Sequence, residues 1–232
     1  MMRHIKTGFV ASLALSALLA ASAVYAEGDD MNPLTRQMDP SADSAAAVKL
    51  RSGSGNPVAG KEKSILCQGC HGTDGISFEP LVPSLAGQYS GYIEKQIRNY
   101  QAGTRSHQIM NAMVGTIAEG DAADIAAFFA SQEKMKGSGS GNETGKELFT
   151  RGDISRVVVA CNNCHGAKGK GLTPNTAMFP VLGGQQKAYI SRQLVNFRED
   201  LRTNSPSNVM NKIARKLTDA EIEALAEYVS AQ

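Results

Sequence analysis

The sequence predicts an all-α protein with two small tandem domains joined by a short linker. Three observations support this prediction. Segments 57–133 and 143–232 repeat each other in order, apolar residues recur at helical spacing, and no alternating strand pattern stands out. Between the segments lies KGSGSGN, a stretch rich in Gly and Ser that is typical of a flexible connection, so we place the linker at 134–142.

The repeat extends along both segments. CQGCHGTDG at 67–75 corresponds to CNNCHGAKG at 161–169, and PSLAGQ at 83–88 corresponds to PVLGGQ at 180–185. Single residues match as well, and the equivalent pairs are Tyr92 and Tyr189, Gln96 and Gln193, Asn99 and Asn196, and Met110 and Met210. The offset between matched positions drifts only from 94 to 100, so the two segments differ by short loop insertions.

The sequence predicts three helices in each segment: one leads into the Cys motif, one follows it, and one closes the segment. The expected ranges are 60–66, 89–100 and 121–131 in the first segment, and 145–149, 188–197 and 218–230 in the second. The closing helices begin at Asp121 and Thr218, residue types that cap helix N-termini. Domains this small bury little apolar surface, so a bulky cofactor would supply part of each core.

Residues 1–26 have the pattern of a secretory signal peptide. Arg3 and Lys6 precede an apolar run that ends near Val24, and small residues favour cleavage after Ala26. A retained membrane anchor is the alternative, because the run is nearly long enough to cross a bilayer. Residues 27–56 are polar and poor in apolar side chains, which predicts a flexible leader.

Charge argues against one class of partner. Without the signal peptide, 22 basic residues balance 22 acidic ones, whereas nucleic-acid binding needs a basic surplus. Segment 57–133 carries a net charge of −3 and segment 143–232 a net charge of +3. This asymmetry gives a dipole that can orient the protein on partners, with chance variation between two solvated surfaces as the alternative.

Every cysteine of the chain lies in a C-x-x-C-H motif, the pattern of c-type haem attachment. Two thiols on one helical turn can each form a thioether with a haem vinyl group, and the following His then offers a nitrogen to iron. The expected attachment residues are Cys67, Cys70, Cys161 and Cys164, and the expected proximal ligands are His71 and His165.

Three other uses of these cysteines fit less well. A single four-thiolate zinc site would need Cys70 and Cys161 to lie far closer in sequence. A thioredoxin-like motif would need a βαβ context, which is absent. Disulfides would not explain why a His follows each pair directly. The sequence therefore predicts two covalently bound haem c groups with their iron.

An electron-transfer iron needs a sixth ligand, and the chain has too few His residues to supply two. Met110 lies 39 residues after His71, and Met210 lies 45 residues after His165, both in a polar loop before the closing helix. A Met thioether in this position raises the reduction potential. Met113 is the alternative to Met110, but alignment from the closing helices pairs it with Ile213, which cannot bind iron and indicates a core position.

A ligating His usually donates its second ring N–H to a fixed acceptor. Pro83 and Pro180 occupy equivalent positions after the two motifs, and a Pro carbonyl can accept such a bond. We expect both carbonyls to do so, with ordinary rigid turns as the alternative.

Over about residues 57–232 the chain resembles the bacterial cytochrome c4 family, whose members contain two cytochrome c domains. The resemblance rests on the paired CQGCH and CNNCH, on PSLAGQYSGYIEKQI and FPVLGGQQKAYISRQLVNFREDLRTN, and on the late Met110 and Met210. It implies His/Met ligation of both irons, by His71 with Met110 and by His165 with Met210. It also implies that the two haem edges face across the domain interface.

The signal peptide predicts a periplasmic protein. A suitable Met in both repeats favours an electron shuttle over an enzyme, since catalysis at iron needs a vacant site. The resemblance implies that the protein feeds a terminal oxidase. The expected partners are redox proteins of the respiratory chain, namely that oxidase and an upstream quinol-oxidising complex or dehydrogenase, with loose association at the membrane surface and no nucleic acid. Two other classes remain open: a haem enzyme such as a peroxidase with an open iron, and a cytochrome subunit tethered to a dehydrogenase or oxidase.

Overall fold

The structure is a computed structural model that describes residues 52–118, 120–172 and 178–232. The chain divides into Met1–Met31 and Asn32–Gln232, and all described residues belong to the second unit. The predicted signal peptide, with its cleavage site, and residues 27–51 of the predicted leader lie outside the described residues. None of the helices in the described part has the length and apolar character needed to cross a bilayer.

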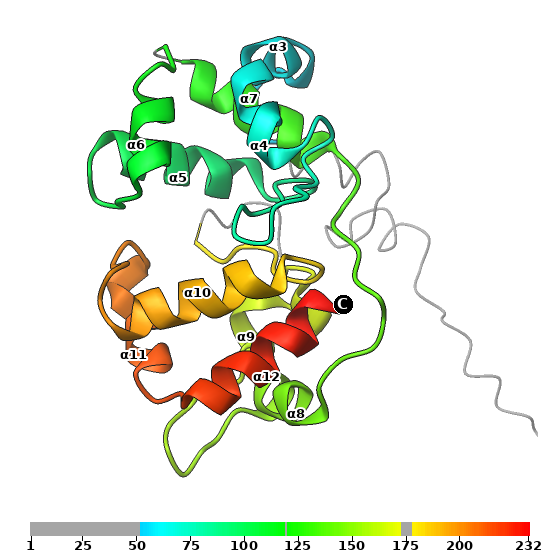
Figure 1. The fold of residues 1–232 in the computed structure, drawn as a ribbon, viewed down its shortest axis with the longest axis vertical. Coiled ribbons are helices and arrows are strands. Elements are labelled where there is room, and N and C mark those ends of the chain that lie inside the picture. Colours follow the sequence, from blue (N-terminus) through cyan, green and yellow to red (C-terminus); the bar gives the residue numbers. More distant parts are fainter. Residues whose placement is uncertain (1–51, 119, 173–177) are drawn as a thin grey trace, which may run out of the picture. The chain divides into compact units, whose positions relative to one another are not determined.

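The fold is helical, as the sequence predicts. Within the described residues, the N-terminal repeat contains α3 (Pro57–Lys63), α4 (Ile65–His71), α5 (Ser90–Gln101), α6 (Gln108–Val114) and α7 (Asp121–Ser131), drawn in cyan and green in Figure 1. The C-terminal repeat contains α8 (Glu143–Arg151), α9 (Asn162–His165), α10 (Lys187–Arg198), α11 (Val209–Ala214) and α12 (Asp219–Ser230), with 3₁₀ turns at Ala167–Gly169 and Pro206–Asn208.

Both repeats share one packing arrangement: the first helix crosses the closing helix at a glycine. α3 packs on α7, and α8 packs on α12. A Cβ at Gly60 would lie 1.9 Å from the Asp124 carbonyl oxygen, and a Cβ at Gly145 would lie 2.0 Å from the Ala224 carbonyl oxygen. Only glycine permits this approach, so the two crossings fix the frame from which each haem motif projects.

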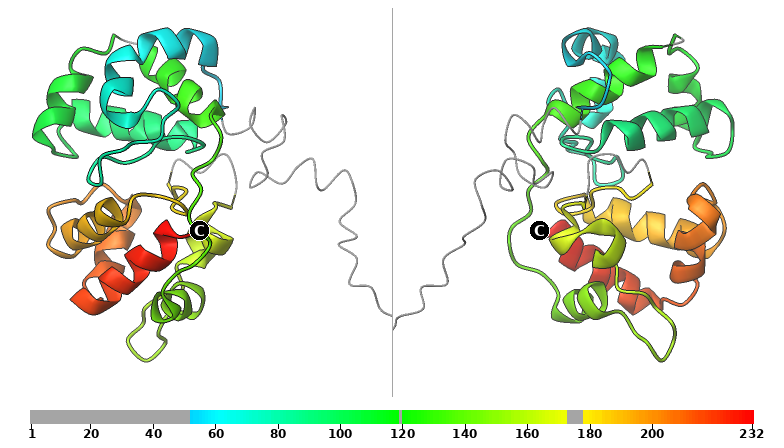
Figure 2. Two further views of the ribbon diagram at one scale, coloured as in Figure 1. Left: turned by 45° about the vertical axis from the view of Figure 1, so that its right-hand side comes forward. Right: turned by 180° about the vertical axis from the view of Figure 1, so that it is seen from behind.

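The closing helices also pack on the middle helices. α7 contacts α5, and α12 contacts α10, which Figure 2 shows in red and gold. Phe128 and Phe129 in the first core correspond to Tyr228 and Val229 in the second, and all four are buried. Each repeat thus has its own small apolar core, against which Cys67 or Cys161 packs.

Two local predictions were wrong. The predicted N-cap Asp121 is the first residue of α7, and the cap is Gly120, whose φ of 89° lies in the left-handed region. Met110 and Met210 lie on the short helices α6 and α11, not in loops. Polar residues at their N-termini support these helices: the His107 side chain accepts the Met110 N–H, and Ser205 Oγ accepts the Met210 N–H.

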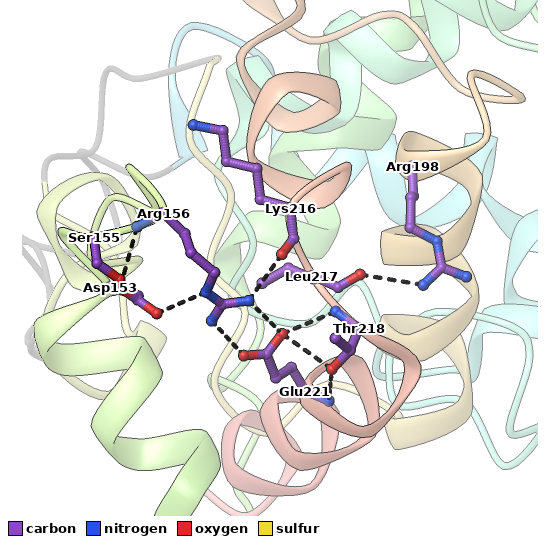
Figure 3. Close-up of polar contacts among 8 residues, drawn as sticks. All are labelled: Asp153, Ser155, Arg156, Arg198, Lys216, Leu217, Thr218 and Glu221. Atoms are coloured by element: carbon purple, nitrogen blue, oxygen red, sulfur yellow. Dashed lines mark hydrogen bonds and ion pairs between the residues drawn. The ribbon is translucent and has the colours of Figure 1, made fainter.

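The C-terminal repeat differs from the first by a small hairpin that leads into Cys161. Asp153 and Val158 form an isolated antiparallel bridge. Arg156 Nε donates to Asp153 Oδ2 at 2.7 Å, and Arg156 Nη2 donates to Glu221 Oε1 at 2.5 Å. Figure 3 shows that Glu221 also belongs to the capping box with Thr218 at the start of α12, so this ion-pair cluster ties the hairpin to the closing helix.

Residues at the edges of the repeats pack against the helices. A Cβ at Gly55, in the predicted leader, would lie 2.1 Å from the Ala123 carbonyl oxygen. In the predicted linker, Met135 is fully buried, and the Gly137 N–H donates to the Gln232 carbonyl at 2.7 Å. The leader and linker limits stay predictions, and parts of both segments pack against the repeats.

Candidate haem sites

The structure places each C-x-x-C-H motif on a short helix that ends at a glycine. Cys67, Cys70 and His71 lie on α4, and Cys161 caps α9, which carries Cys164 and His165. The next residues, Gly72 and Gly166, have φ values of 87° and 75°. A Cβ there would lie 2.0 Å from the Ile76 carbonyl oxygen or 2.1 Å from the Gly171 carbonyl oxygen, so a side chain is excluded directly after each His.

None of the four cysteines forms a disulfide. Burial raises the pKa of Cys67 above its ordinary value and that of Cys161 to about 11. In the described ranges, no group of three or more His, Cys, Asp or Glu side chains comes together as a metal site.

Both histidines are held by the proline carbonyls that the sequence predicts. His71 Nδ1 lies 2.8 Å from the Pro83 carbonyl oxygen, and His165 Nδ1 lies 2.9 Å from the Pro180 carbonyl oxygen. Because a carbonyl only accepts, Nδ1 carries the proton in both rings. Burial lowers the pKa of both imidazoles, which keeps them neutral at neutral pH.

This arrangement fits a haem iron. The structure gives Nε2 of His71 and His165 no hydrogen-bond partner among the described residues, so this nitrogen is the one left to ligate. A neutral imidazole with Nδ1–H bound to a backbone carbonyl is the form in which His binds metals. Thiols for two thioethers precede each ring on the same helical turn, so the donor set matches a covalently attached haem.

Met110 and Met210 occupy equivalent places, as their neighbouring asparagines show. Asn111 Nδ2 donates to the Tyr100 carbonyl at 2.7 Å, and Asn211 Nδ2 donates to the Phe197 carbonyl at 2.9 Å. These carbonyls lie at matching positions near the ends of α5 and α10. The residue before each Asn is therefore the equivalent one, which supports Met110 over Met113.

The structure does not give Met113 the core position that its pairing with Ile213 indicates. Met110 packs against the N-terminal core and Ile213 against the C-terminal core, whereas Met113 is half-buried and lies outside both described cores. Two further side chains of ligating type, Met178 and His107, are exposed: Met178 is 48% exposed, and His107 caps α6. Iron ligation by His71, Met110, His165 and Met210 stays a prediction.

Sequence reasoning missed a cluster of buried cations between the repeats. Arg105 and Arg202 are 8% and 7% exposed. Arg105 Nη2 donates to Tyr189 Oη at 3.0 Å, and Arg202 Nη2 donates to Tyr92 Oη at 2.9 Å, so each Arg bonds the other repeat. The signal that could have found them is the recurrence of an Arg six residues after Asn99 and Asn196.

Within the described residues, Arg105, Arg202 and the neighbouring Lys95 form no ion pair with a carboxylate. Burial together with Coulomb repulsion from Arg202 and Arg105 lowers the pKa of Lys95. Unpaired buried charge is costly, so such a cluster calls for an anion. The propionates of a bound haem would supply such negative charge, which makes this cluster a second feature that fits the cofactor.

Comparisons with known proteins agree with this reading. A family profile described as cytochrome c matches residues 142–232. The chain is 39% identical to cytochrome c4 of Pseudomonas aeruginosa over 183 residues, which cover 78% of this chain and 90% of that protein. It is 32% identical to the thiosulfate dehydrogenase electron acceptor of Stutzerimonas stutzeri over 182 residues, 76% of this chain and 81% of that protein.

Among solved structures, reduced recombinant cytochrome c4 from Pseudomonas stutzeri superposes with a TM-score of 0.71 at 36% identity. The match covers 77% of this chain and 99% of that one. The chain therefore carries two covalently bound haem c groups, whose attachment sites the cysteines of both motifs fit, and the all-α fold is that of two tandem cytochrome c domains. By fold, motifs and likeness over most of its length, the chain belongs to the cytochrome c4 family of dihaem electron carriers.

Proposed function

We propose that the mature protein shuttles electrons in the periplasm between partners of the respiratory chain, delivering them to a terminal oxidase. His71 with Met110 and His165 with Met210 ligate the two irons. The single observation that carries this proposal is the equivalence of the two sites: each has the same His–Pro bond and a Met followed by the same bonded Asn. Two closed irons suit electron transfer and leave no open position for catalysis.

The upstream donor is a quinol-oxidising complex or a dehydrogenase. A relative named as a thiosulfate dehydrogenase electron acceptor supports the dehydrogenase. Contacts with such partners are small and transient, as electron-transfer encounters usually are. The opposed charges of segments 57–133 and 143–232 predict a moderate dependence of the reaction rate on ionic strength.

The location rests on residues 1–26. We expect cleavage after Ala26, which leaves Glu27 at the N-terminus of an exported protein. N-terminal sequencing of the purified protein tests this expectation. A first residue of Met1 or Met2 would favour the retained anchor.

The function is tested by mixing the reduced protein with a membrane preparation that contains the oxidase, and separately with peroxide, while both haems are followed by absorbance. We expect rapid reoxidation by the membranes and no catalytic consumption of peroxide. Fast peroxide turnover would replace the shuttle with a haem enzyme. A stable subunit that co-purifies with the protein would favour the tethered cytochrome.

A further inference from the structure

A buried glutamine in each repeat forms two hydrogen bonds with the backbone of one residue in the other repeat. Gln185 Oε1 accepts the Ser84 N–H at 2.8 Å, and Gln185 Nε2 donates to the Ser84 carbonyl at 2.8 Å. Gln88 does the same to Val181, with distances of 2.9 Å and 2.8 Å. Gln88 and Gln185 are 4% and 5% exposed, so both pairs are shielded from water.

The residues bonded by the glutamines, Ser84 and Val181, directly follow the prolines whose carbonyls accept from the haem histidines. The Pro83 carbonyl, which accepts from His71 Nδ1, and the Ser84 N–H, which donates to Gln185, belong to one peptide unit. The same holds for the unit between Pro180 and Val181. Each proximal His is therefore joined through a single peptide unit to a glutamine from the opposite repeat.

Hydrogen bonds linked through one peptide unit reinforce each other. An N–H that donates to a strong acceptor makes the carbonyl of its own peptide unit more negative, and that carbonyl then accepts more strongly. A stronger bond at Nδ1 makes the imidazole a better electron donor to iron. This favours the oxidised iron and lowers the reduction potential.

We propose that Gln88 and Gln185 are positioning residues that tune the haems in a crossed manner. Gln185, in the C-terminal repeat, lowers the potential of the N-terminal haem through Ser84 and Pro83. Gln88, in the N-terminal repeat, lowers the potential of the C-terminal haem through Val181 and Pro180. This inference rests on the proposed ligation of iron by His71 and His165.

The effect of each glutamine on the haem of the other repeat distinguishes this proposal from a purely structural role. A residue that only supports its own domain would affect the haem of that domain. A residue that only holds the repeats together would affect both haems alike when it is lost. Only the hydrogen-bonded series from His through Pro to Gln predicts that each glutamine affects the haem of the other repeat.

The experiment measures both potentials by spectroelectrochemical titration, with haem methyl NMR signals identifying each iron. In Gln185→Leu, we expect the reduction equilibrium of the N-terminal haem to shift about threefold toward the reduced form, with the C-terminal haem unchanged. For one electron this is about 30 mV, at 59 mV per tenfold change. Gln88→Leu is expected to shift the C-terminal haem instead.

Gln186→Leu is the matched control. Gln186 Nε2 also donates across the repeats, to the Ser77 carbonyl, but its side chain makes no hydrogen bond to the Ser84 backbone in the described part of the chain. We expect both potentials to remain at the wild-type values. If Gln185→Leu fails to fold, Gln185→Glu keeps an acceptor oxygen for the Ser84 N–H and is expected to lower the potential of the N-terminal haem more than that of the other.

Equal shifts of both haems in Gln185→Leu, a shift confined to the C-terminal haem, or no shift at all would overturn the inference. Absence of two low-spin haems in the wild-type spectrum would contradict the proposed function first. If the wild-type spectra show two low-spin haems but each glutamine variant does not shift the haem of the other repeat, only the proposed tuning between repeats is contradicted.

Discussion

The Arg105 guanidinium of the N-terminal repeat donates a hydrogen bond of 3.0 Å to the hydroxyl of Tyr189 in the C-terminal repeat. The same guanidinium bonds Gln96 of its own repeat at 2.7 Å and Gln193 of the other at 3.1 Å. One buried cation thus organises polar side chains of both repeats. Its loss removes three hydrogen bonds, although Arg202 still donates to Gln96 and Gln193.

We therefore expect Arg105→Met to lower the free energy of unfolding by about 3 kcal/mol, because buried acceptors lose a charged donor. Tyr189→Phe removes one of these bonds and is expected to cost about 1 kcal/mol. Denaturant titration of the two haem-loaded variants measures both values. Equal small losses would show that the Arg105 cluster does not hold the repeats together.

Met110 and Met113 are distinguished by their substitution to Ala. Met110→Ala is expected to lower the potential of the N-terminal haem and abolish its Met–iron charge-transfer absorption. Met113→Ala is expected to cost about 2 kcal/mol of stability, because its side chain is half-buried, and to leave the potential in place. The reverse pattern would show that Met113 is the ligand.

The crossing of α8 and α12 predicts a strong effect at Gly145. Gly145→Ala places a Cβ 2.0 Å from the Ala224 carbonyl oxygen, so the helices must separate, at a cost of about 3 kcal/mol. Gly103→Ala is the control, because its Cβ would meet nothing within 4 Å and only its φ of +69° is unfavourable, at about 1 kcal/mol. Similar midpoints of thermal unfolding for the two variants would contradict the close crossing.

The hairpin cluster predicts a loss of stability in acid. Hydrogen bonds from Ser155 and Arg156 lower the pKa of Asp153 from 3.8 to about 2, and Arg156 also lowers the pKa of Glu221. A lowered folded-state pKa means that the contribution is present above the unfolded value and is lost as pH falls from 3.8 to about 2. The urea midpoint of wild type is expected to fall over this window more steeply than that of Arg156→Ala, and parallel curves would contradict the coupling.

Sequence and structure agree best where a requirement is local. The matching places of Pro83 and Pro180 after the two C-x-x-C-H motifs anticipate the bonds that His71 and His165 make to them. These features depend on spacing within about fifteen residues, and the chain records that spacing directly.

The contacts between the repeats could not be predicted in this way. Gln185 and Ser84 lie 101 residues apart, and their bond depends on how two folded units dock. The sequence repeat shows that Gln88 and Gln185 are equivalent. That each bonds the backbone of the other repeat depends on how the two folded repeats pack together. Met110 and Met210 lie on short helices because His107 and Ser205 support the N-termini, a signal too weak to read from polar loop composition.

The central claim, that a Met closes each iron and leaves it fit only for electron transfer, is tested most directly with carbon monoxide. The reduced, native protein is equilibrated with the gas and its haem absorbance is recorded. We expect a spectrum unchanged from that of the reduced protein alone, because both sixth positions are occupied. Rapid formation of a carbon monoxide complex at either haem would show an open iron and contradict the account.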